Sequence, residues 1–201
     1  ADWFKILWVN RNGHRKQLNE LLPTFKMFLD YLEKEYGHRK AVLLLRTEPT
    51  DPEGPNVFAN IDLYGINENV ILIEEKLDYP LMNVLYNAAD LNMNISKAEG
   101  FGLTLLTAMN TKTLNAGVMT GGMKEQLVDV DTQEKFGLPI MVHHRNLVGS
   151  QVVPYIYEDY ASRQDILNTM IQAYNMPKEE KDILVNKAYE RATTFFGYRK
   201  I

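Results

Sequence analysis

A strand that runs directly into a glycine-rich turn is the feature that most constrains how this chain can fold. The alternating stretch 90–95 is followed without a break by SKAEGFGL, residues 96–103, and a helix is expected to begin near Leu103. A helix start leaves backbone N–H groups without partners, and these favour an anion such as a phosphate. Glu99 would repel a phosphate, but an ionised carboxylate accepts hydrogen bonds from sugar hydroxyls. The turn therefore indicates a site for a phosphate next to a sugar.

Strands and helices are expected to alternate through most of the chain. Apolar runs predict strands, and apolar residues recurring every three or four positions predict helices. This order predicts an α/β fold, with a Rossmann-like doubly wound, mostly parallel sheet and helices on both faces. Pro23 is expected to kink the first helix or delay its start. The expected strands are 6–9, 41–45, 70–73, 91–95, 113–116 and 139–142, and the expected helices are 16–36, 57–64, 80–88, 103–109, 163–174 and 178–196, with a turn or short helix at 122–128.

Size and composition exclude several classes of function. The 201 residues, 45% hydrophobic and 24% charged, suit one globular domain spanning 1–201. The net charge of −4 argues against general nucleic-acid binding. No apolar run approaches the roughly 18 residues that a transmembrane segment needs. With no signal-peptide pattern and no cysteine, a reducing, cytoplasmic location is expected. The chain begins at Ala1 and enters a strand almost at once, so it is interpreted as a fragment.

Several sequence blocks follow one another in a characteristic order. They are Asn83–Asp90, Glu99–Leu103, Ala108-Met109 and Gly121–Glu125, and near the start Asn10–Lys16 places a lysine five positions after an arginine. Together they resemble the donor-binding, C-terminal half of family-4-like retaining glycosyltransferases with the two-domain GT-B architecture, over roughly residues 5–160. The resemblance implies hexosyl transfer from a nucleoside-diphosphate sugar, used as substrate, with no cofactor and no metal. It also implies a glycan, lipid or other acceptor bound by an N-terminal domain that is absent here.

The resemblance also implies roles for single residues. Arg11 and Lys16 would contact the donor diphosphate and stabilise the charge on the leaving group, which needs fixed cations rather than a proton carrier. Glu99 would bind hydroxyls of the transferred sugar, and these three are the candidate catalytic residues. The loops that carry Arg11 and Glu99 are expected at one edge, the carboxyl ends of the strands. The candidate donor-binding residues are Gly100, Phe101, Gly102, Leu103, Thr107, Gly121, Gly122 and Glu125.

Each of these candidates also has a simpler interpretation. Arg11 and Lys16 are also explained as surface cations, with Lys16 on the solvent face of its helix, and Glu99 as a carboxylate that favours the positive end of a helix. The segment 121–125 and Gln126 fit a capped turn nearly as well as a site. The block 147–159, together with the tyrosines at 155, 157 and 160 and two carboxylates, suits either a carbohydrate cleft or a surface that packs against the missing half. His143-His144 would point to opposite faces of a strand and are not expected to share a metal ion.

Several positions depart from the pattern of the resembled family. Thr107 stands where a second glutamate would hold the ribose hydroxyls of the nucleotide. Lys112 and Leu114 replace a glycine and a proline before the next strand, and Arg46-Thr47 replaces a glycine after the second one. These changes leave open an alternative, a non-catalytic nucleotide-sugar binding or interaction module. A third alternative is an unrelated doubly wound domain that binds a phosphorylated metabolite.

Overall fold

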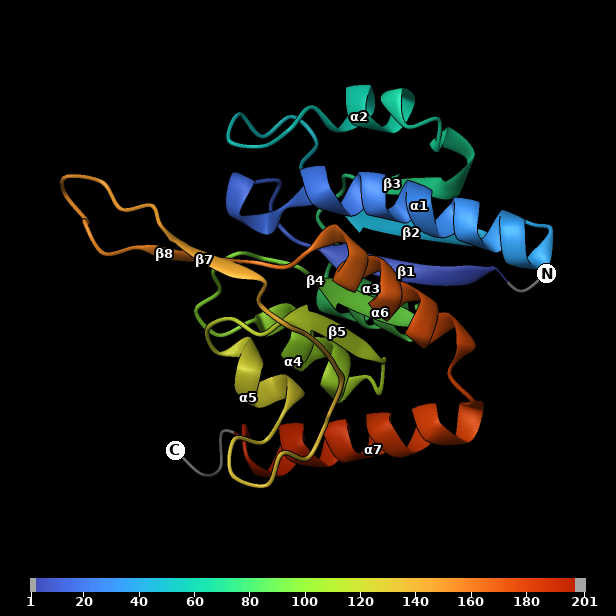
Figure 1. Ribbon diagram of the computed structural model, residues 1–201. Coiled ribbons are helices and arrows are strands. Elements are labelled where there is room, and N and C mark those ends of the chain that lie inside the picture. The colour runs from blue at the N-terminus through green and yellow to red at the C-terminus, as the bar shows by residue number, and fades with distance from the viewer. Residues whose placement is uncertain (1–2, 198–201) are drawn as a thin grey trace.

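Six parallel strands form the centre of the structure, a computed structural model that describes residues 3–197 (Figure 1). The first and last residues of the predicted domain, 1–2 and 198–201, lie outside the described part. The strands are ordered β3-β2-β1-β4-β5-β6, and each neighbouring pair is parallel. This is the doubly wound sheet that the sequence predicts. The strands are β1 Phe4–Val9, β2 Ala41–Arg46, β3 Val70–Ile73, β4 Leu91–Asn94, β5 Asn115–Val118 and β6 Leu138–Ile140.

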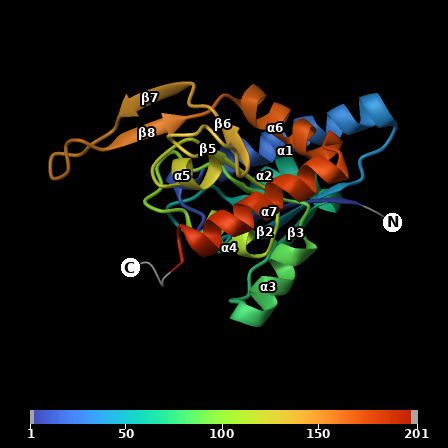
Figure 2. The same ribbon diagram turned by 90° about the horizontal axis from the view of Figure 1, so that it is seen from below.

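Helices cover both faces of this sheet. Figure 2 shows α1 and α6 on one side and α3 on the other. Leu18, Phe25 and Phe28 of α1 join the larger core with the strands, while Tyr86 of α3 and Ala108 of α4 pack with the opposite face. The predicted layered arrangement is therefore confirmed. The helices are α1 Leu18–Tyr36, α2 Val57–Leu63, α3 Tyr79–Ala88, α4 Leu103–Asn110, α5 Met123–Leu127, α6 Arg163–Asn175 and α7 Lys178–Thr194, with short 3-10 turns η1 His14–Lys16 and η2 Asn67–Asn69.

The order of the strands creates a crevice at one edge of the sheet. The chain leaves β1 toward β2 and β3, then returns to place β4 on the other side of β1, where Ile6 pairs with Leu91. Loops that follow β1 and β4 therefore diverge at the carboxyl ends of adjacent strands. Ligands of doubly wound sheets bind at such a reversal point.

The start of α1 differs from the prediction. The expected helix from residue 16 is divided at Gln17, which has a left-handed backbone with φ 59°, so that His14–Lys16 forms a separate 3-10 turn. The helix then continues through Pro23, the sixth helical residue, and Pro23 itself is buried. A proline near the first turn removes only one intrahelical hydrogen bond, and burial of the apolar stripe on α1 holds the helix together.

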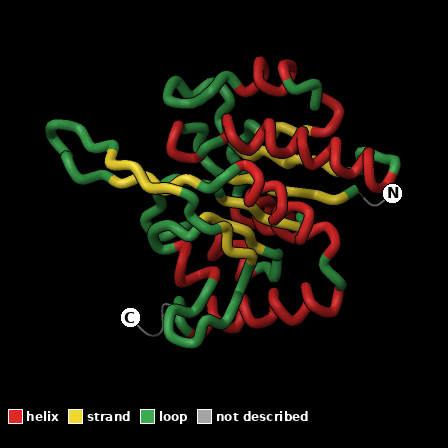
Figure 3. Tube along the Cα trace, in the orientation of Figure 1, coloured by secondary structure: helices red, strands yellow, loops and turns green. Residues whose placement is uncertain are grey.

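Two features of the strands also differ. The strand expected at 113–116 lies at Asn115–Val118, because Lys112 adopts a left-handed conformation with φ 55° and extends the turn after α4. An antiparallel hairpin outside the main sheet was not predicted. Its strands are β7 His144–Leu147 and β8 Tyr157–Tyr160, and it projects from the body as an arm whose outer part is loop (Figure 3). Among the described helices, none combines the length and hydropathy required to traverse a bilayer.

Candidate functional site

The turn after β4 is shaped by a buried asparagine. Asn94 Oδ1 accepts hydrogen bonds from the Ser96 backbone N–H (3.0 Å) and from Ser96 Oγ (2.6 Å). Asn94 Nδ2 donates to Thr104 Oγ1 at 3.1 Å, in the first turn of α4. One side chain thus fixes both ends of the segment between strand and helix, which carries Glu99.

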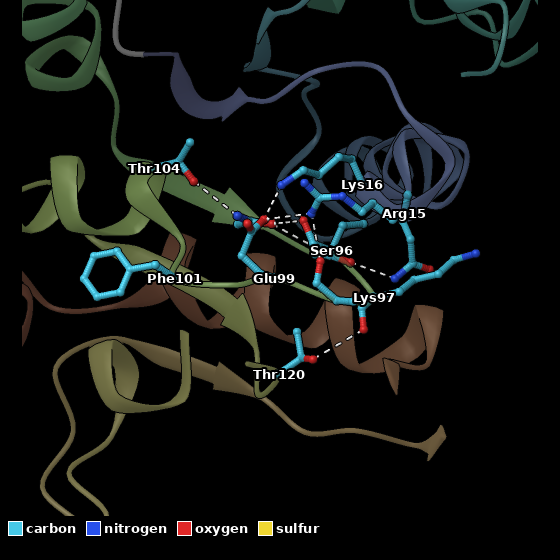
Figure 4. Close-up of polar contacts among 12 residues, drawn as sticks. Arg15, Lys16, Ser96, Lys97, Glu99, Phe101, Thr104 and Thr120 are labelled. Atoms are coloured by element: carbon cyan, nitrogen blue, oxygen red, sulfur yellow. Dashed lines mark hydrogen bonds and ion pairs between the residues drawn. The ribbon is translucent and has the colours of Figure 1, made fainter. Parts of the chain in front are cut away.

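Glu99 lies between two cations from the loop after β1. Lys16 Nζ forms an ion pair with Glu99 Oε2, and Arg15 Nη1 lies 3.4 Å from the same oxygen (Figure 4). The side chains of Lys16 and Glu99 are only 9% and 13% exposed. Arg15 Nη1 also donates to the carbonyl of Ala98 at 2.8 Å. Lys16 is therefore directed into the site, and its placement on a solvent-facing helix surface is ruled out.

Backbone and side-chain contacts hold the two loops together. The Lys97 N–H donates to the carbonyl of Arg15 at 2.8 Å. Buried Gln17 donates through Nε2 to the carbonyl of Ile95 at 2.7 Å, at the end of β4. These hydrogen bonds between the loop after β1 and the loop after β4 therefore hold Arg15, Lys16 and Glu99 next to one another.

Burial and charge have opposing effects on this ion pair. Burial lowers the pKa of Lys16, and the hydrogen bond and charge of Glu99 offset this only in part. Burial acts to raise the pKa of Glu99, but the hydrogen bond and charge of Lys16, assisted by Arg15, outweigh it and hold that pKa below its usual value. Glu99 is therefore ionised at neutral pH and can only accept hydrogen bonds.

The glycines of the 121–125 block pack directly beneath the Glu99 turn. The Gly122 N–H donates to the carbonyl of Gly100 at 2.9 Å. A Cβ on Gly122 would lie 2.6 Å from the same carbonyl oxygen, so the two loops touch through backbone atoms. Gln126, fully buried, donates through Nε2 to the carbonyl of Phe101 at 2.6 Å. Gln126 thus supports the turn from below, while the Glu125 side chain is exposed and forms no hydrogen bond or ion pair with any described residue.

The start of α4 faces this turn without a side-chain cap. Gly102 is its N-cap, with φ 90°, and no side-chain cap accepts a hydrogen bond from the backbone N–H groups at the helix start. Leu103 and Phe101 are exposed, and the Phe101 ring packs edge-on against Phe196, with centroids 5.6 Å apart. Thr107, one turn later, donates its hydroxyl to the carbonyl of Leu103 at 2.9 Å. Uncapped backbone N–H groups, a carboxylate and two cations therefore converge at the crevice.

Arg11 lies in a different cluster of charges. Its Nε and Nη2 contact Asp51 Oδ2 and Oδ1 at 2.5 and 3.1 Å, and its Nη1 lies 3.1 Å from Glu53 Oε2. No hydrogen bond or ion pair joins Arg11 to Glu99 within residues 3–197. The structure thus brings Lys16 to Glu99, a contact that was not predicted, and places Arg15 rather than Arg11 beside it. In the sequence, the one indication that Arg15 would lie in this site was its position next to Lys16.

The arm is fastened to the same site by a buried carboxylate, Asp159, which the sequence offered only as one of two carboxylates of a possible carbohydrate cleft. Asp159 of β8 is held by Arg145 at 2.6 and 3.0 Å and accepts a 2.7 Å hydrogen bond from Thr120 Oγ1. Its backbone N–H donates to the carbonyl of Lys97 at 2.7 Å. The outer residues Tyr155 and Tyr157 are exposed, while the Tyr160 ring stacks on His144 with centroids 4.6 Å apart.

The elements and their order are those of the C-terminal, Rossmann-like domain of glycosyltransferases with the GT-B architecture. No protein-family model and no curated protein sequence matches the chain. Among solved structures it is similar to the C-terminal domain of LpcC, a glycosyl transferase group 1 family protein from Francisella tularensis. The TM-score is 0.69 at 18% identity, over 97% of this chain and 87% of that one.

Two longer proteins show the same likeness. HepE from Anabaena, in complex with UDP-glucose, gives a TM-score of 0.70 at 15% identity, covering 96% of this chain and 44% of that one. Sucrose-phosphate synthase from Thermosynechococcus elongatus gives 0.70 at 20% identity, covering 99% of this chain and 43% of that one. The chain thus spans less than half the length of either protein. At these identities the likeness establishes the fold, and the predicted resemblance to the C-terminal half is confirmed at that level.

Proposed function

We propose that this chain is the donor-binding half of a retaining glycosyltransferase, which transfers a hexose-type residue from a nucleoside-diphosphate sugar to a glycan, lipid or other acceptor. The meeting of Lys16 and Glu99 at the reversal point of the sheet, beside the uncapped start of α4, is the observation that carries this proposal. The fold shared with HepE, which was solved in complex with UDP-glucose, supports the same ligand class. The resemblance of the ordered sequence blocks is what supports the proposed retaining stereochemistry.

The roles follow from the chemistry of the groups. Lys16 supplies a fixed positive charge to the donor diphosphate, and the N–H groups at the start of α4 add to it. Glu99 accepts hydrogen bonds from the hydroxyls of the transferred sugar, because its carboxylate is ionised. In the donor-free chain these two groups neutralise each other. The donor replaces that single contact with two, one to its phosphate and one to its sugar.

Catalysis requires an acceptor, and we place acceptor binding in a preceding domain. This chain corresponds to 44% and 43% of the two longer proteins of the same fold. On its own it is proposed to bind the donor without efficient turnover. The leaving diphosphate is stabilised by protein cations and backbone dipoles, so no metal ion or cofactor is proposed.

One observation favours a second candidate, a nucleotide-sugar binding module without catalysis. Thr107, at the position expected to hold the ribose, already donates its hydroxyl to the carbonyl of Leu103 at 2.9 Å. Its remaining capacity is that of a weak neutral acceptor, compared with the carboxylate of the family pattern. Sugar transfer by a chain that also carries an acceptor-binding half supports the enzyme, and donor binding without transfer in that chain supports the module.

Calorimetric titration with UDP, GDP, ADP, TDP and their sugar conjugates tests donor binding. A ligand at about a hundred times its Kd should also stabilise the fold by about 2.7 kcal/mol. We expect Lys16→Met to weaken both the bare diphosphate and its sugar conjugate. Glu99→Gln should weaken the conjugate alone, because only the sugar contacts this carboxylate.

The matched controls for this titration are Lys34→Met and Glu35→Gln. They remove the same charges from an exposed ion pair, 3.2 Å long, at the C-terminal end of α1. Both should bind like the unmodified chain. Absence of binding for every nucleoside diphosphate at millimolar concentration would exclude the donor site.

A further inference from the structure

Every nitrogen of the Arg11 guanidinium is already bound to a carboxylate. Asp51 accepts hydrogen bonds from Nε and Nη2, at 2.5 and 3.1 Å. Glu53 forms an ion pair with Nη1 at 3.1 Å. The Asp51 side chain is only 7% exposed. Its hydrogen bond to Arg11 holds the pKa of Asp51 below its usual value, and the same contact raises the pKa of Arg11. A phosphate could therefore bind the Arg11 guanidinium only by displacing these carboxylates from it.

The loop after β2, which carries Asp51 and Glu53, is held in place by further contacts besides the ion pairs with Arg11. Buried Asn12 donates through Nδ2 to the carbonyl of Pro55 at 2.9 Å. The His14 N–H donates to the carbonyl of Glu53 at 3.1 Å. A Cβ on Gly54 would lie 2.0 Å from the carbonyl oxygen of Asn12, so the two backbones are in direct contact. The loop that carries Asp51 and Glu53 is thus held against the segment that carries Arg11.

Arg15 differs from Arg11 in how many of its guanidinium nitrogens are already bound, although both side chains are similarly exposed. It uses Nη1 for the carbonyl of Ala98 and for Glu99, at 2.8 and 3.4 Å. Its Nε and Nη2 have no hydrogen-bond partner among the described residues, and its side chain is about half exposed. Figure 4 shows Arg15 and Lys16 reaching the same carboxylate from one short segment. One edge of this guanidinium is therefore available for a two-point contact with phosphate oxygens.

The local charge balance separates the two arginines further. Around Arg11, two carboxylates outnumber one guanidinium, so the cluster is negative overall. Around Arg15, two cations outnumber the single carboxylate of Glu99, so that cluster is positive. A diphosphate is attracted to the second cluster and repelled by the first.

We propose that Arg15 supplies the guanidinium of the donor site, and that Asp51 and Glu53 hold Arg11 out of it. This inference rests on the proposed function and moves one of its contacts by four residues from the position that the sequence pattern indicates. Arg15 is then a diphosphate-binding residue beside Lys16, while Arg11 fastens the loop after β2.

Titration of UDP, GDP, ADP and TDP into the unmodified chain, Arg15→Gln and Arg11→Gln tests this assignment. Loss of a charge-assisted two-point contact should weaken binding about 10- to 100-fold in Arg15→Gln. Arg11→Gln should remain within about twofold of the unmodified chain. Circular dichroism melting confirms that each variant is folded, and where Arg15→Gln is not, Arg15→Lys replaces it. The lysine keeps the charge but lacks the fork, so a loss of about threefold or more is expected.

Three results would overturn the assignment. An equal or larger loss in Arg11→Gln would return the role to Arg11 and leave the proposed function standing. Unchanged binding in the folded Arg15 variant would remove Arg15 from the site, again without affecting the proposed function. Absence of binding in the unmodified chain for all four diphosphates would exclude the donor site and this inference with it.

Discussion

Gly121 lies directly against the backbone of Glu99: a Cβ placed on Gly121 would come within 1.6 Å of the Glu99 carbonyl oxygen. The Gly121 backbone is also left-handed, with φ 50°. Glycine at this position therefore satisfies two independent requirements, a conformation and a close approach. The loop after β5 fits beneath the turn after β4 only because no side chain stands between them.

Substitution of Gly121 by alanine should displace the Glu99 turn. We expect a loss of about 2 kcal/mol or more in the free energy of unfolding, since overpacking adds to the strain of a left-handed alanine. Donor affinity should fall as well, because Glu99 moves. Urea denaturation and calorimetric titration measure the two effects. Gly65→Ala is the matched control, because Gly65 has a similar φ of 59° but nothing within 4 Å of an added Cβ. An equal loss in both variants would show that only backbone strain matters.

The Lys16–Glu99 pair should show strong energetic coupling. Glu99→Gln leaves Lys16 largely buried without its counter-charge, and Lys16→Met leaves Glu99 only the longer contact with Arg15. Each variant should therefore cost about 2 kcal/mol of stability. The double variant should be more stable than the sum of the two losses by about 1 kcal/mol or more. Urea denaturation of the four chains gives this cycle. The same cycle at the exposed pair Lys34 and Glu35 should show no coupling, and additivity at Lys16 and Glu99 would contradict the paired geometry.

Asp159 should make stability depend on pH in the acidic range. The hydrogen bond from Arg145 is the largest influence, and it holds the pKa of Asp159 below its usual value although burial opposes it. A carboxyl group with a lowered folded-state pKa stabilises the fold above its unfolded pKa, about 3.9, and loses this contribution as the pH falls through the folded value. Asp159→Asn should therefore be less stable at pH 7 and flatten the decline below about pH 5.

Chemical denaturation between pH 7 and pH 2.5 measures this difference. Asp30→Asn, which removes a carboxylate from an exposed ion pair with Lys26, is the control and should change neither stability nor slope appreciably. Parallel curves for the Asp159→Asn variant and the unmodified chain would show that Asp159 is not a determinant of acid stability.

Replacement of Thr107 by glutamate should strengthen nucleotide binding. Thr107 is partly exposed on α4, so a longer side chain can extend toward the crevice. A carboxylate that accepts ribose hydroxyls should tighten UDP or the preferred diphosphate about tenfold. Inorganic pyrophosphate, which has no ribose, is the matched ligand and should bind equally or more weakly because of the added negative charge. Tighter binding of pyrophosphate, or no gain for the nucleotide, would contradict a ribose position next to residue 107.

The fold followed from the sequence where apolar residues formed long or regular patterns. The helix α1 was predicted because burial on one face leaves a periodic signal, and β3 was predicted because Val70–Ile73 is a short continuous apolar run. The arm was missed because the four residues of β7 are all exposed and its pairing with β8 depends on a contact across the loop. The start of β5 was misplaced because the left-handed Lys112 carries no local signal of its turn.

The sequence by itself determined the doubly wound order of elements, the glycine turn before α4 and the candidate site residues Lys16 and Glu99 in the loops after the first and fourth strands. These depend on local patterns, namely apolar periodicity, helix starts and loops that follow buried strands. Only the tertiary structure decided which arginine meets Glu99, 84 residues away from Arg15 in the chain. Asp51 reaches Arg11 because β2 lies beside β1 on one side, and Glu99 reaches Arg15 and Lys16 because β4 lies on the other. The order of the strands decides which loops are neighbours at the edge of the sheet, and therefore which charged side chains pair. The spacing of residues along the sequence does not reveal that order.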